Sequence, residues 1–567
     1  MSLPATDGKT TPNRAAGSLA EFLHSWRYFI WLLGLLLLAG LFFIEENWRG
    51  EWAWNSYKRA MAARGEPTEF SAVVPPRVPD DKNFAMTPFL APIFDFAPGM
   101  SPGNSPFASN YDAASNELKT TNTARLNSWV KNRTDLPAWH AAFLNVSNLI
   151  ARQEAEAADP AFAASAAKLQ RYGLSPLPPG IHNTANKGAD RKGWATAADF
   201  TVPEAAAGVL AGLSDTASVF EELQVAGKLP CSRFNIHYDD KDPAAILLPH
   251  LAVMKRLTQV LSLRACAELA LGQTDQAFED TRLLLRLVDA CKDEPLLISQ
   301  LVRMAQLALA LQPVAEGMPR WSEPQLRALQ AQLAGFDFCS DARRAMVAER
   351  LWCSATIEYI RRSPDKFNQI GGGSGGRQSG LDLVASLMSI APGGWFALEQ
   401  LNCSRMVDEC LLPTIDLANR QISPRVSRKA EERISAVTKR SPAGLFLRHH
   451  FASAFLLPGG SRTARKAAYS QTADDCAIIA CALERYHRGK GCYPAALGEL
   501  QPQFIQKLPH DVINGEPLKY RRTEAGRYLL YSVGWNEKDD GGVISVGKTR
   551  DETSLTEGDW VWGLPEG

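Results

Sequence analysis

The sequence lacks an excess of charge of either sign. Its 567 residues include 61 Lys and Arg and 61 Asp and Glu, so the formal net charge is zero. Proteins that bind nucleic acids normally carry a basic excess or a basic stripe, because their affinity comes largely from neutralising phosphates. Neither feature is visible here. The sequence therefore argues against a nucleic-acid partner.

The chain also lacks the cysteine patterns of a disulfide framework or a structural zinc site. It has ten cysteines, and they form no paired C-x2-C motifs. Most lie in apolar, helix-like surroundings, where free cysteine behaves as a small buried hydrophobic residue. In an exported protein Cys403 could pair with Cys410, and Cys476, Cys481 and Cys492 could also oxidise. Spacing alone leaves their disulfide status open.

Recognisable catalytic motifs are missing too. There is no H-E-x-x-H motif, and no serine or cysteine nucleophile has identifiable partners. One polar cluster, HYDDKD, contains His237, Asp239, Asp240 and Asp242. A histidine among carboxylates can perform general acid–base chemistry, which would make the protein an envelope hydrolase. The alternative is a polar loop whose acids precede a helix, where the helix dipole favours negative charge.

What the sequence does contain is one long apolar run near its N-terminus. Residues 28–44, YFIWLLGLLLLAGLFFI, carry no charge over 17 positions. That length is the lower limit for a helix that crosses about 30 Å of hydrocarbon. Tryptophans flank both ends, as in the aromatic belts of membrane proteins. No A-x-A-like cleavage site follows, so we predict an uncleaved signal-anchor that crosses the membrane once.

The charges beside this run indicate its orientation. Arg27 precedes it, and Glu45 and Glu46 follow it directly, which favours a cytoplasmic N-terminus. Arg49 and the basic residues after it weaken this preference, but a long C-terminal domain is translocated largely regardless of its charge. We therefore expect a single-pass protein of the bacterial inner membrane with the bulk of its chain in the periplasm.

The rest of the chain divides by composition. We expect an N-terminal tail (1–27), the transmembrane helix (28–44), a short helix with a proline-rich extended strap (45–134), a helical domain (135–461) and a C-terminal α+β module (462–567). Proline fixes φ and removes a backbone donor, so the strap should lie extended against the body. The helical domain is interrupted by the glycine-rich segment GGGSGGRQSG at 371–380, which we interpret as a loop.

The clearest helical pattern is a hairpin over residues 249–290. Pro249 suits the first turn of one helix, Gly272 should end it, and Thr274 should cap the next. This hairpin is similar to a tetratricopeptide-type unit. No second copy follows 34 residues later, so we predict a mainly α fold with an irregular bundle and not a regular solenoid.

The C-terminal module begins with a helix predicted over about 466–489. Two β-rich runs follow, 518–522 and 527–533, joined by Thr-Glu-Ala-Gly, and they predict an antiparallel hairpin. The module should therefore consist of one long helix packed on a small sheet.

The motifs of this module occur in a specific order: ALERYHRGKGCYPAALGEL, LPHD, LKY, YLLYSVGWNEKDDGG and GDWVW. This order resembles the globular domain of type II secretion major pseudopilins. The whole chain also resembles an uncharacterised family of single-pass bacterial membrane proteins, in RGEWAWNSYKRAMAARGE, VPPRVPDDKNFAMTP and GGWFALEQLNCSRM. A prepilin leader is absent, so we do not expect a pilus subunit. An accessory role in a type II secretion or pilus-like system stays open.

The pseudopilin resemblance implies a calcium site in the loop after the S-x-G strand end. The implied ligands are Asn536, Asp539, Asp540 and Asp559, with Asn536 in place of the family's loop acid. Calcium takes about six to eight oxygen ligands, which carboxylates, amides and carbonyls can supply. The loop does not fit an EF-hand, because Lys538 stands where an acid is required. The alternative is a hairpin end in which Asp and Gly serve turn geometry.

These observations predict a membrane-anchored envelope protein. The anchor and the helical pairs favour a non-enzymatic scaffold or interaction protein with protein partners in the envelope. In this hypothesis the pseudopilin-like module serves as a docking or structural cap.

Overall fold

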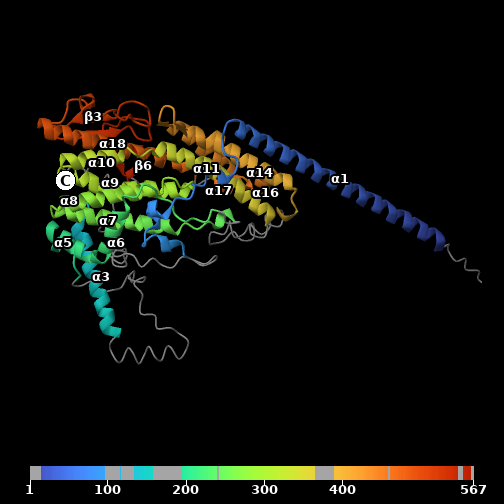
Figure 1. The fold of residues 1–567 in the computed structure, drawn as a ribbon. Coiled ribbons are helices and arrows are strands. Elements are labelled where there is room, and N and C mark those ends of the chain that lie inside the picture. The colour runs from blue at the N-terminus through green and yellow to red at the C-terminus, as the bar shows by residue number, and fades with distance from the viewer. Residues whose placement is uncertain are drawn as a thin grey trace, which may run out of the picture.

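The computed structural model describes residues 14–95, 115, 133–157, 194–238, 242–363, 388–457, 460–546 and 553–563. The protein is mainly helical, as predicted, with an N-terminal apolar helix and a few short strands that lie mostly in its C-terminal part. The glycine-rich segment 371–380 lies outside the described residues. Figure 1 shows the first helix, α1 (Arg14–Ala63), extending away from a body of packed helices.

Helix α1 contains the predicted membrane segment. It is one uninterrupted helix of 50 residues and extends beyond that segment at both ends. Its apolar part is only 6% buried, and large apolar side chains from Trp26 to Ile44 are exposed. A continuous helix satisfies its backbone hydrogen bonds internally, as hydrocarbon requires. The helix is therefore long and apolar enough to anchor the protein in a membrane. Pro243–Ala270 and Leu297–Gly317 are also long and apolar, but they are 44% and 72% buried within the body.

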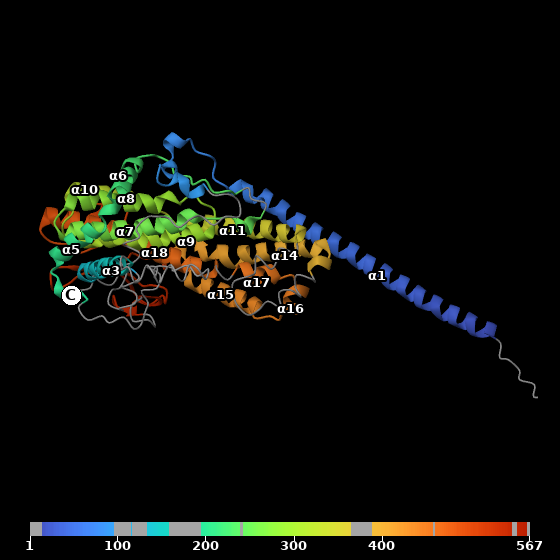
Figure 2. The same cartoon turned by 90° about the horizontal axis from the view of Figure 1, so that it is seen from below.

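Where α1 reaches the body, it crosses helix α14 (Gly393–Met406) at a pair of glycines. A Cβ on Gly50 would lie 2.1 Å from the backbone oxygen of Gly394, and a Cβ on Gly394 would lie 2.1 Å from the backbone oxygen of Glu46. Only glycine permits so close an approach of two backbones. Figures 1 and 2 show the two helices side by side.

Side-chain hydrogen bonds fix this crossing. The Gly394 backbone N–H donates to Asn47 Oδ1 at 2.8 Å, and the Trp395 indole N–H donates to Glu46 Oε2 at 3.0 Å. Both acceptors belong to α1, and both donors belong to the first turn of α14, whose backbone N–H groups have no partner within the helix. The start of α14 is thus capped by the anchor helix.

A second set of contacts between α1 and the body lies on the C-terminal side of the glycine crossing, further along the chain from the membrane segment. The Tyr57 hydroxyl donates to Asp408 Oδ2 at 2.7 Å. Arg350, whose side chain is almost fully buried, pairs with Asp408 and, at 2.9 Å, with Glu66. Since a buried charge is costly unless it is paired, these ion pairs hold α1 and the following strap in one position on the body.

The described part of the proline-rich strap, residues 64–95, lies against the body but is not the continuous extended segment that its prolines predicted. It forms short 3-10 turns: η1 (Phe70–Val73), η2 (Asp80–Lys82), η3 (Phe84–Met86) and η4 (Ala91–Phe94). Phe70, Phe84 and Phe94 are buried. Asn83 fixes the strap by two hydrogen bonds of 2.8 Å with the backbone of Arg233.

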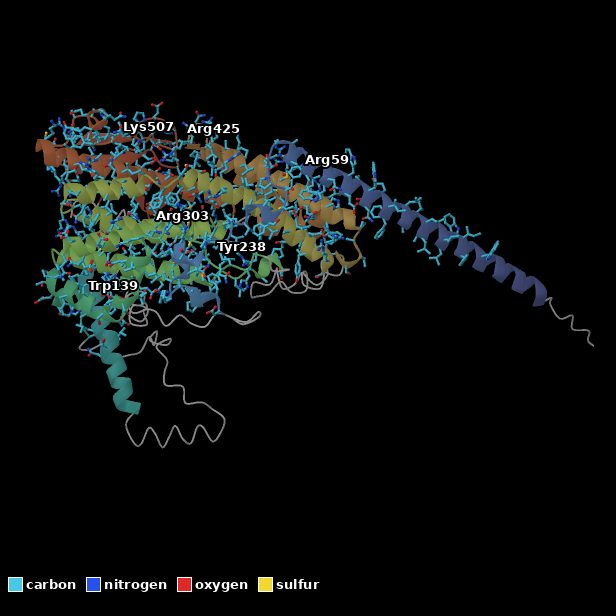
Figure 3. All side chains as sticks on the ribbon, in the orientation of Figure 1. Arg59, Trp139, Tyr238, Arg303, Arg425 and Lys507 are labelled. Carbon is cyan, nitrogen blue, oxygen red and sulfur yellow. The ribbon has the colours of Figure 1, made fainter. Side chains whose placement is uncertain are left out.

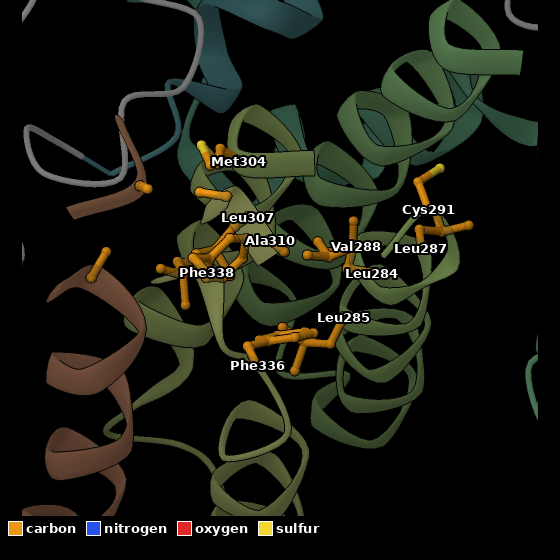
Figure 4. Packing of buried hydrophobic residues seen from close by; sticks show 14 of the residues in the cluster. Leu284, Leu285, Leu287, Val288, Cys291, Met304, Leu307, Ala310, Phe336 and Phe338 are labelled. Atoms are coloured by element: carbon orange, nitrogen blue, oxygen red, sulfur yellow. The ribbon is translucent and has the colours of Figure 1, made fainter. Parts of the chain in front are cut away.

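The body is a bundle of helices. These are α3 (Leu136–Ala157), α5 (Val202–Gly212), α6 (Ala217–Ala226), α7 (Pro249–Ala270), α8 (Thr274–Ala290), α9 (Leu297–Gly317), α10 (Glu323–Leu333), α11 (Phe338–Arg362), α15 (Pro424–Thr438), α16 (Pro442–Leu447), α17 (Phe451–Leu456) and α18 (Thr463–Lys490), with a π-helical turn at Val407–Leu411. Figure 4 shows the centre of the core, where Leu284 and Val288 of α8 pack near Leu307 of α9 and Phe338 of α11.

Helices α7 and α8 confirm the predicted hairpin. Pro249 is the first residue of α7, and Gly272 has φ +75° between the helices. The prediction that Thr274 caps the second helix was wrong. Thr274 is the first residue of α8, Gln273 occupies the cap position, and the Thr274 hydroxyl lies 3.5 Å from the Gly272 carbonyl oxygen.

The C-terminal part contains the predicted helix and hairpin. Helix α18 ends at Gly491, which has φ +75°. Strands β3 (Lys519–Arg522) and β4 (Tyr528–Ser532) are antiparallel, and β7 (Trp560–Trp562) pairs with the other edge of β4. Two further pairs are β1 (Ile415–Asp416) with β2 (Gln421–Ile422), and β5 (Ile544–Val546) with β6 (Thr553–Gly558).

Helix α18 packs on this sheet and also on α9, α10 and α11. One continuous hydrophobic core consequently extends from Phe84 in the strap to Trp562 in β7. The C-terminal strands are thereby fixed to the helical bundle through α18.

The glycine crossing makes a direct prediction. Gly394→Ala should destabilise the protein by about 1–3 kcal/mol, because the new methyl group overlaps the α1 backbone and one helix must move. Gly489→Ala in α18 is the matched control, since a Cβ there has no neighbour within 4 Å. Denaturant unfolding of the full chain in detergent measures both variants. Equal stability of the two would contradict the crossing.

Candidate functional site

The structure brings Asp559 to the WNEKDDGG loop, as the calcium prediction requires. Strand β7 pairs with β4 so that Ser532 lies opposite Trp560, which places the preceding Asp559 beside the loop. The buried Asp559 carboxylate accepts the backbone N–H of Asp540 at 3.2 Å and that of Gly542 at 2.6 Å. Asp559 thus closes the loop through hydrogen bonds to its backbone.

The other three predicted ligands also make hydrogen bonds within the protein. Asn536 Nδ2 donates to Asp540 Oδ2 at 2.8 Å. Asp539 Oδ1 accepts the Tyr531 hydroxyl at 3.0 Å and the Gly541 N–H at 3.1 Å, and these donors, the backbone one first, lower the pKa of Asp539. The contacts account for the loop as a hairpin end. Calcium binding at these residues stays a prediction.

Of the second predicted cluster, the structure describes His237 and Asp242, while Asp239 and Asp240 lie outside the described residues. His237 is exposed. Asp242 Oδ1 accepts the Ala244 N–H at 2.9 Å and caps the 3-10 turn η8 (Pro243–Ala245). Asp242 thus caps a three-residue 3-10 turn, and the next long helix, α7, begins only at Pro249. General acid–base chemistry at this cluster stays a prediction.

All ten cysteines lie among the described residues, and all are free thiols. Eight are buried, Cys231 is half-buried, and Cys492 is exposed. Burial raises the pKa of Cys476 and Cys481, which keeps these thiols protonated at neutral pH. A protonated buried thiol is a poor nucleophile, so these two cysteines serve packing.

A buried group of His250, Cys291 and Glu294 was not found by sequence reasoning. Potential ligand atoms of the three residues lie within 4.8 Å of one another. The His250 ring is fully buried and stacks on Phe234 at 4.3 Å. Its Nε2 lies 2.8 Å from Glu294 Oε1, a hydrogen-bond distance. Two ligands of a tetrahedral zinc ion with bonds of about 2.1 Å would lie about 3.4 Å apart. The observed 2.8 Å is shorter than this separation, so His250 and Glu294 contact each other directly. Their contact links α7 to the connection between α8 and α9.

A cavity of about 700 Å³ lies between α10, α18 and the segment 502–510, beside two buried carboxylates. Lys507, labelled in Figure 3, is one of its lining residues. The α18 wall carries Asp474 and Asp475, both of which are buried. We call this the Asp474 cavity.

The two adjacent aspartates have different partners. Asp475 forms a bidentate ion pair with Arg420, at 3.0 and 2.7 Å. Asp474 Oδ1 has no hydrogen-bond partner among the described residues, and Asp474 Oδ2 lies 3.4 Å from Gln471 Nε2. Burial and the neighbouring Asp475 carboxylate raise the pKa of Asp474 well above its usual value. This environment favours the protonated form of the Asp474 carboxyl over the ionised form.

Arg485, which also belongs to α18, connects this helix to the other walls of the cavity. Its guanidinium donates to Gln330 Oε1 at 2.7 Å and to the Phe504 carbonyl at 2.8 Å, and it pairs with Glu323 at 3.1 Å. A neutral acid can donate a hydrogen bond that an ionised one cannot. The cavity thus combines a buried carboxyl that favours its protonated form with fixed guanidinium groups, a combination suited to a polar ligand that carries oxygen acceptors.

The chain was compared with known proteins at three levels. No family model, curated protein or solved structure matches it. The resemblance to pseudopilins and to a family of single-pass membrane proteins accordingly stays a prediction, and the interpretation of each site rests on its own geometry.

Because Asp474 and Asp475 have different partners, replacing each with asparagine should change the free energy of unfolding in opposite directions. Unfolded Asp474 loses its proton above about pH 4. Because the native pKa is raised, the native residue loses its proton only at higher pH, so native stability should fall as pH rises above about 4. The slope is at most about 1.4 kcal/mol per pH unit. Asp474→Asn should remove this slope and be more stable than the natural protein at pH 8.

Asp475→Asn should instead destabilise the protein at neutral pH by about 1–3 kcal/mol, since it leaves the Arg420 guanidinium without its charged partner. Denaturant unfolding at pH 5, 6.5 and 8 measures both variants. Similar behaviour of the two would show that the environments of the aspartates do not differ as described.

If the predicted calcium ligands bind the ion, calcium should specifically stabilise the full chain. Calcium at 100 times its dissociation constant should raise the free energy of unfolding by about 2.7 kcal/mol. Asp540→Ala should abolish the effect, and magnesium at the same concentration should not reproduce it. Thermal unfolding with calcium, magnesium or chelator is the measurement. An unchanged midpoint in calcium would identify the loop as a hairpin end alone.

Proposed function

We propose that this protein is a membrane-anchored scaffold or interaction protein of the bacterial cell envelope. In this proposal α1 is a single-pass anchor in the inner membrane, and the body lies in the periplasm and binds protein partners. The observation that carries the proposal is the rigid connection between anchor and body. Helix α1 passes from its apolar segment to the Gly50–Gly394 crossing without a break.

This connection favours a scaffold because it restricts orientation as well as location. A flexible linker would let the body rotate freely beside the membrane. Here the Asn47 and Glu46 hydrogen bonds and the ion pairs of Arg350 hold the body at one angle to the anchor. A surface presented at a constant angle and height can bind envelope partners that are themselves fixed in the membrane.

An envelope hydrolase is the second candidate function, and one observation favours it. Asp474 lines a cavity and has an oxygen without a partner among the described residues. A carboxyl group in that position can supply a proton to a bound substrate when it is protonated. We therefore propose the Asp474 cavity as a second candidate location for this chemistry, beside the predicted cluster at His237. Accessory membership of a type II secretion or pilus-like system is a more specific form of the scaffold proposal.

The scaffold proposal predicts that partner contacts depend on the rigid connection. Photo-crosslinking residues at the exposed positions Val225, Ile298 and Leu417 should capture discrete envelope proteins in cells. Inserting Gly-Gly-Ser after Ile44 should abolish or change these adducts, because it separates the anchor from the body and leaves the α14 crossing intact.

The same insertion before residue 14 is the matched control and should leave the adducts unchanged. A pattern of adducts that survives the insertion after Ile44 would contradict a scaffold of fixed orientation. Turnover of an envelope substrate that is lost in Asp474→Asn would favour the hydrolase.

The proposed orientation makes a separate prediction. A membrane-impermeant maleimide should label the exposed Cys492 in intact spheroplasts, because the body would lie outside the cytoplasm. Cys492→Ser should lose the label. Labelling that appears only after lysis would place the body in the cytoplasm.

A further inference from the structure

The end of the body nearest the membrane segment has an exposed apolar surface. It is formed by residues 388–395 and 439–450, which we call the membrane-proximal end. Ile390 is 68% exposed, and Leu447, the last residue of α16, is 67% exposed. In Figures 1 and 2, α16 lies at the end of the body from which the apolar part of α1 projects.

Trp395 connects the two parts of this end. Its ring lies 5.0 Å from the ring of Phe446 and 5.1 Å from that of His449, both in edge-to-face geometry. The indole N–H donates to Glu46 of α1. The first turn of α14 and the end of α16 are therefore held together beside the anchor helix.

A contact with the membrane segment sets the depth of this end. Phe42, which belongs to the apolar run 28–44, packs edge-to-face on Trp395 with ring centroids 6.3 Å apart. Phe42 lies two residues before the end of the run, about 3 Å along the helix axis. A side chain that contacts Phe42 must therefore lie close to the boundary between hydrocarbon and headgroups, where tryptophan is enriched.

The charges around this end complement an anionic lipid surface. Lys439, Arg440 and Arg448 flank α16, and Lys439 and Arg448 are exposed. On the facing part of α1, the carboxylates of Glu45 and Glu46 are already paired with Arg49. Basic side chains next to exposed apolar ones are the composition of segments that bind the interface of anionic membranes.

We propose that the membrane-proximal end is a second membrane contact, in which Ile390 and Leu447 insert into the lipid interface and Lys439, Arg440 and Arg448 lie among anionic lipid headgroups. The proposal rests on the proposed function, because it requires α1 to span the membrane. With two contacts instead of one, the body cannot tilt about the anchor.

The test uses the full chain in phosphatidylcholine–phosphatidylglycerol nanodiscs. An environment-sensitive nitrobenzoxadiazole probe is attached to one introduced cysteine at a time, in a background with Cys231→Ser and Cys492→Ser. The three positions are Leu447→Cys in the proposed contact, Leu36→Cys in the anchor and Val225→Cys on the body, where the side chain is 71% exposed. Lipids brominated on their acyl chains quench a probe that reaches the bilayer.

Quenching is expected at positions 36 and 447 and not at 225. Quenching at 36 without quenching at 447 would overturn the second contact and leave the anchor intact. No quenching at 36 would overturn both the anchor and the contact that rests on it. Quenching at all three positions would show general adsorption of the body and would overturn a localised contact.

A double substitution tests whether the basic side chains next to α16 bind anionic headgroups. Arg440→Glu with Arg448→Glu should reduce quenching at 447 and leave quenching at 36 unchanged, and pure phosphatidylcholine discs should have the same effect. Undiminished quenching at 447 in both cases would overturn the role of anionic headgroups.

Discussion

The approach of α1 to α14 at Gly50 and Gly394 is the constraint on which the rest of the arrangement depends. Two backbones in direct contact leave no room to slide or rotate, so the crossing sets both the angle and the height of the body relative to the apolar segment. Asn47 accepts the Gly394 backbone N–H in the first turn of α14, and Glu46 accepts the indole N–H of Trp395. The contact of Phe42 with Trp395 follows from the same register.

Buried arginines fix the body in a comparable way. Arg303, in the middle of the bundle in Figure 3, donates to the Val288 carbonyl at 2.9 Å and pairs with Asp341. Arg350 and Arg420 similarly join segments that are distant in the sequence. Each guanidinium has several donors in a rigid plane and must be satisfied when buried. Such pairs contribute little net stability, but their geometry permits few alternative packings of the helices they connect.

Several elements could be predicted from the sequence because their signals are local. The apolar run indicated α1, Pro249 and Gly272 marked the limits of α7, and alternating β-rich runs around Thr-Glu-Ala-Gly indicated the β3–β4 hairpin. Thr274 was assigned the wrong position because helix ends vary by a residue, and the structure begins α8 at Thr274 itself. Asp559 was placed near the loop by resemblance, and the structure shows that β7 brings it there.

The sequence by itself determined the class of the protein: a mainly helical chain with one apolar helix near its N-terminus and a small β hairpin. Those properties depend on residues close together in the chain. Tertiary structure decided which groups meet. Asn47 and Gly394 are 347 residues apart, His250 and Glu294 are 44 apart, and no spacing indicates either pair. The raised pKa of Asp474 likewise depends on its burial, because desolvation acts through neighbours in space and not through neighbours in sequence.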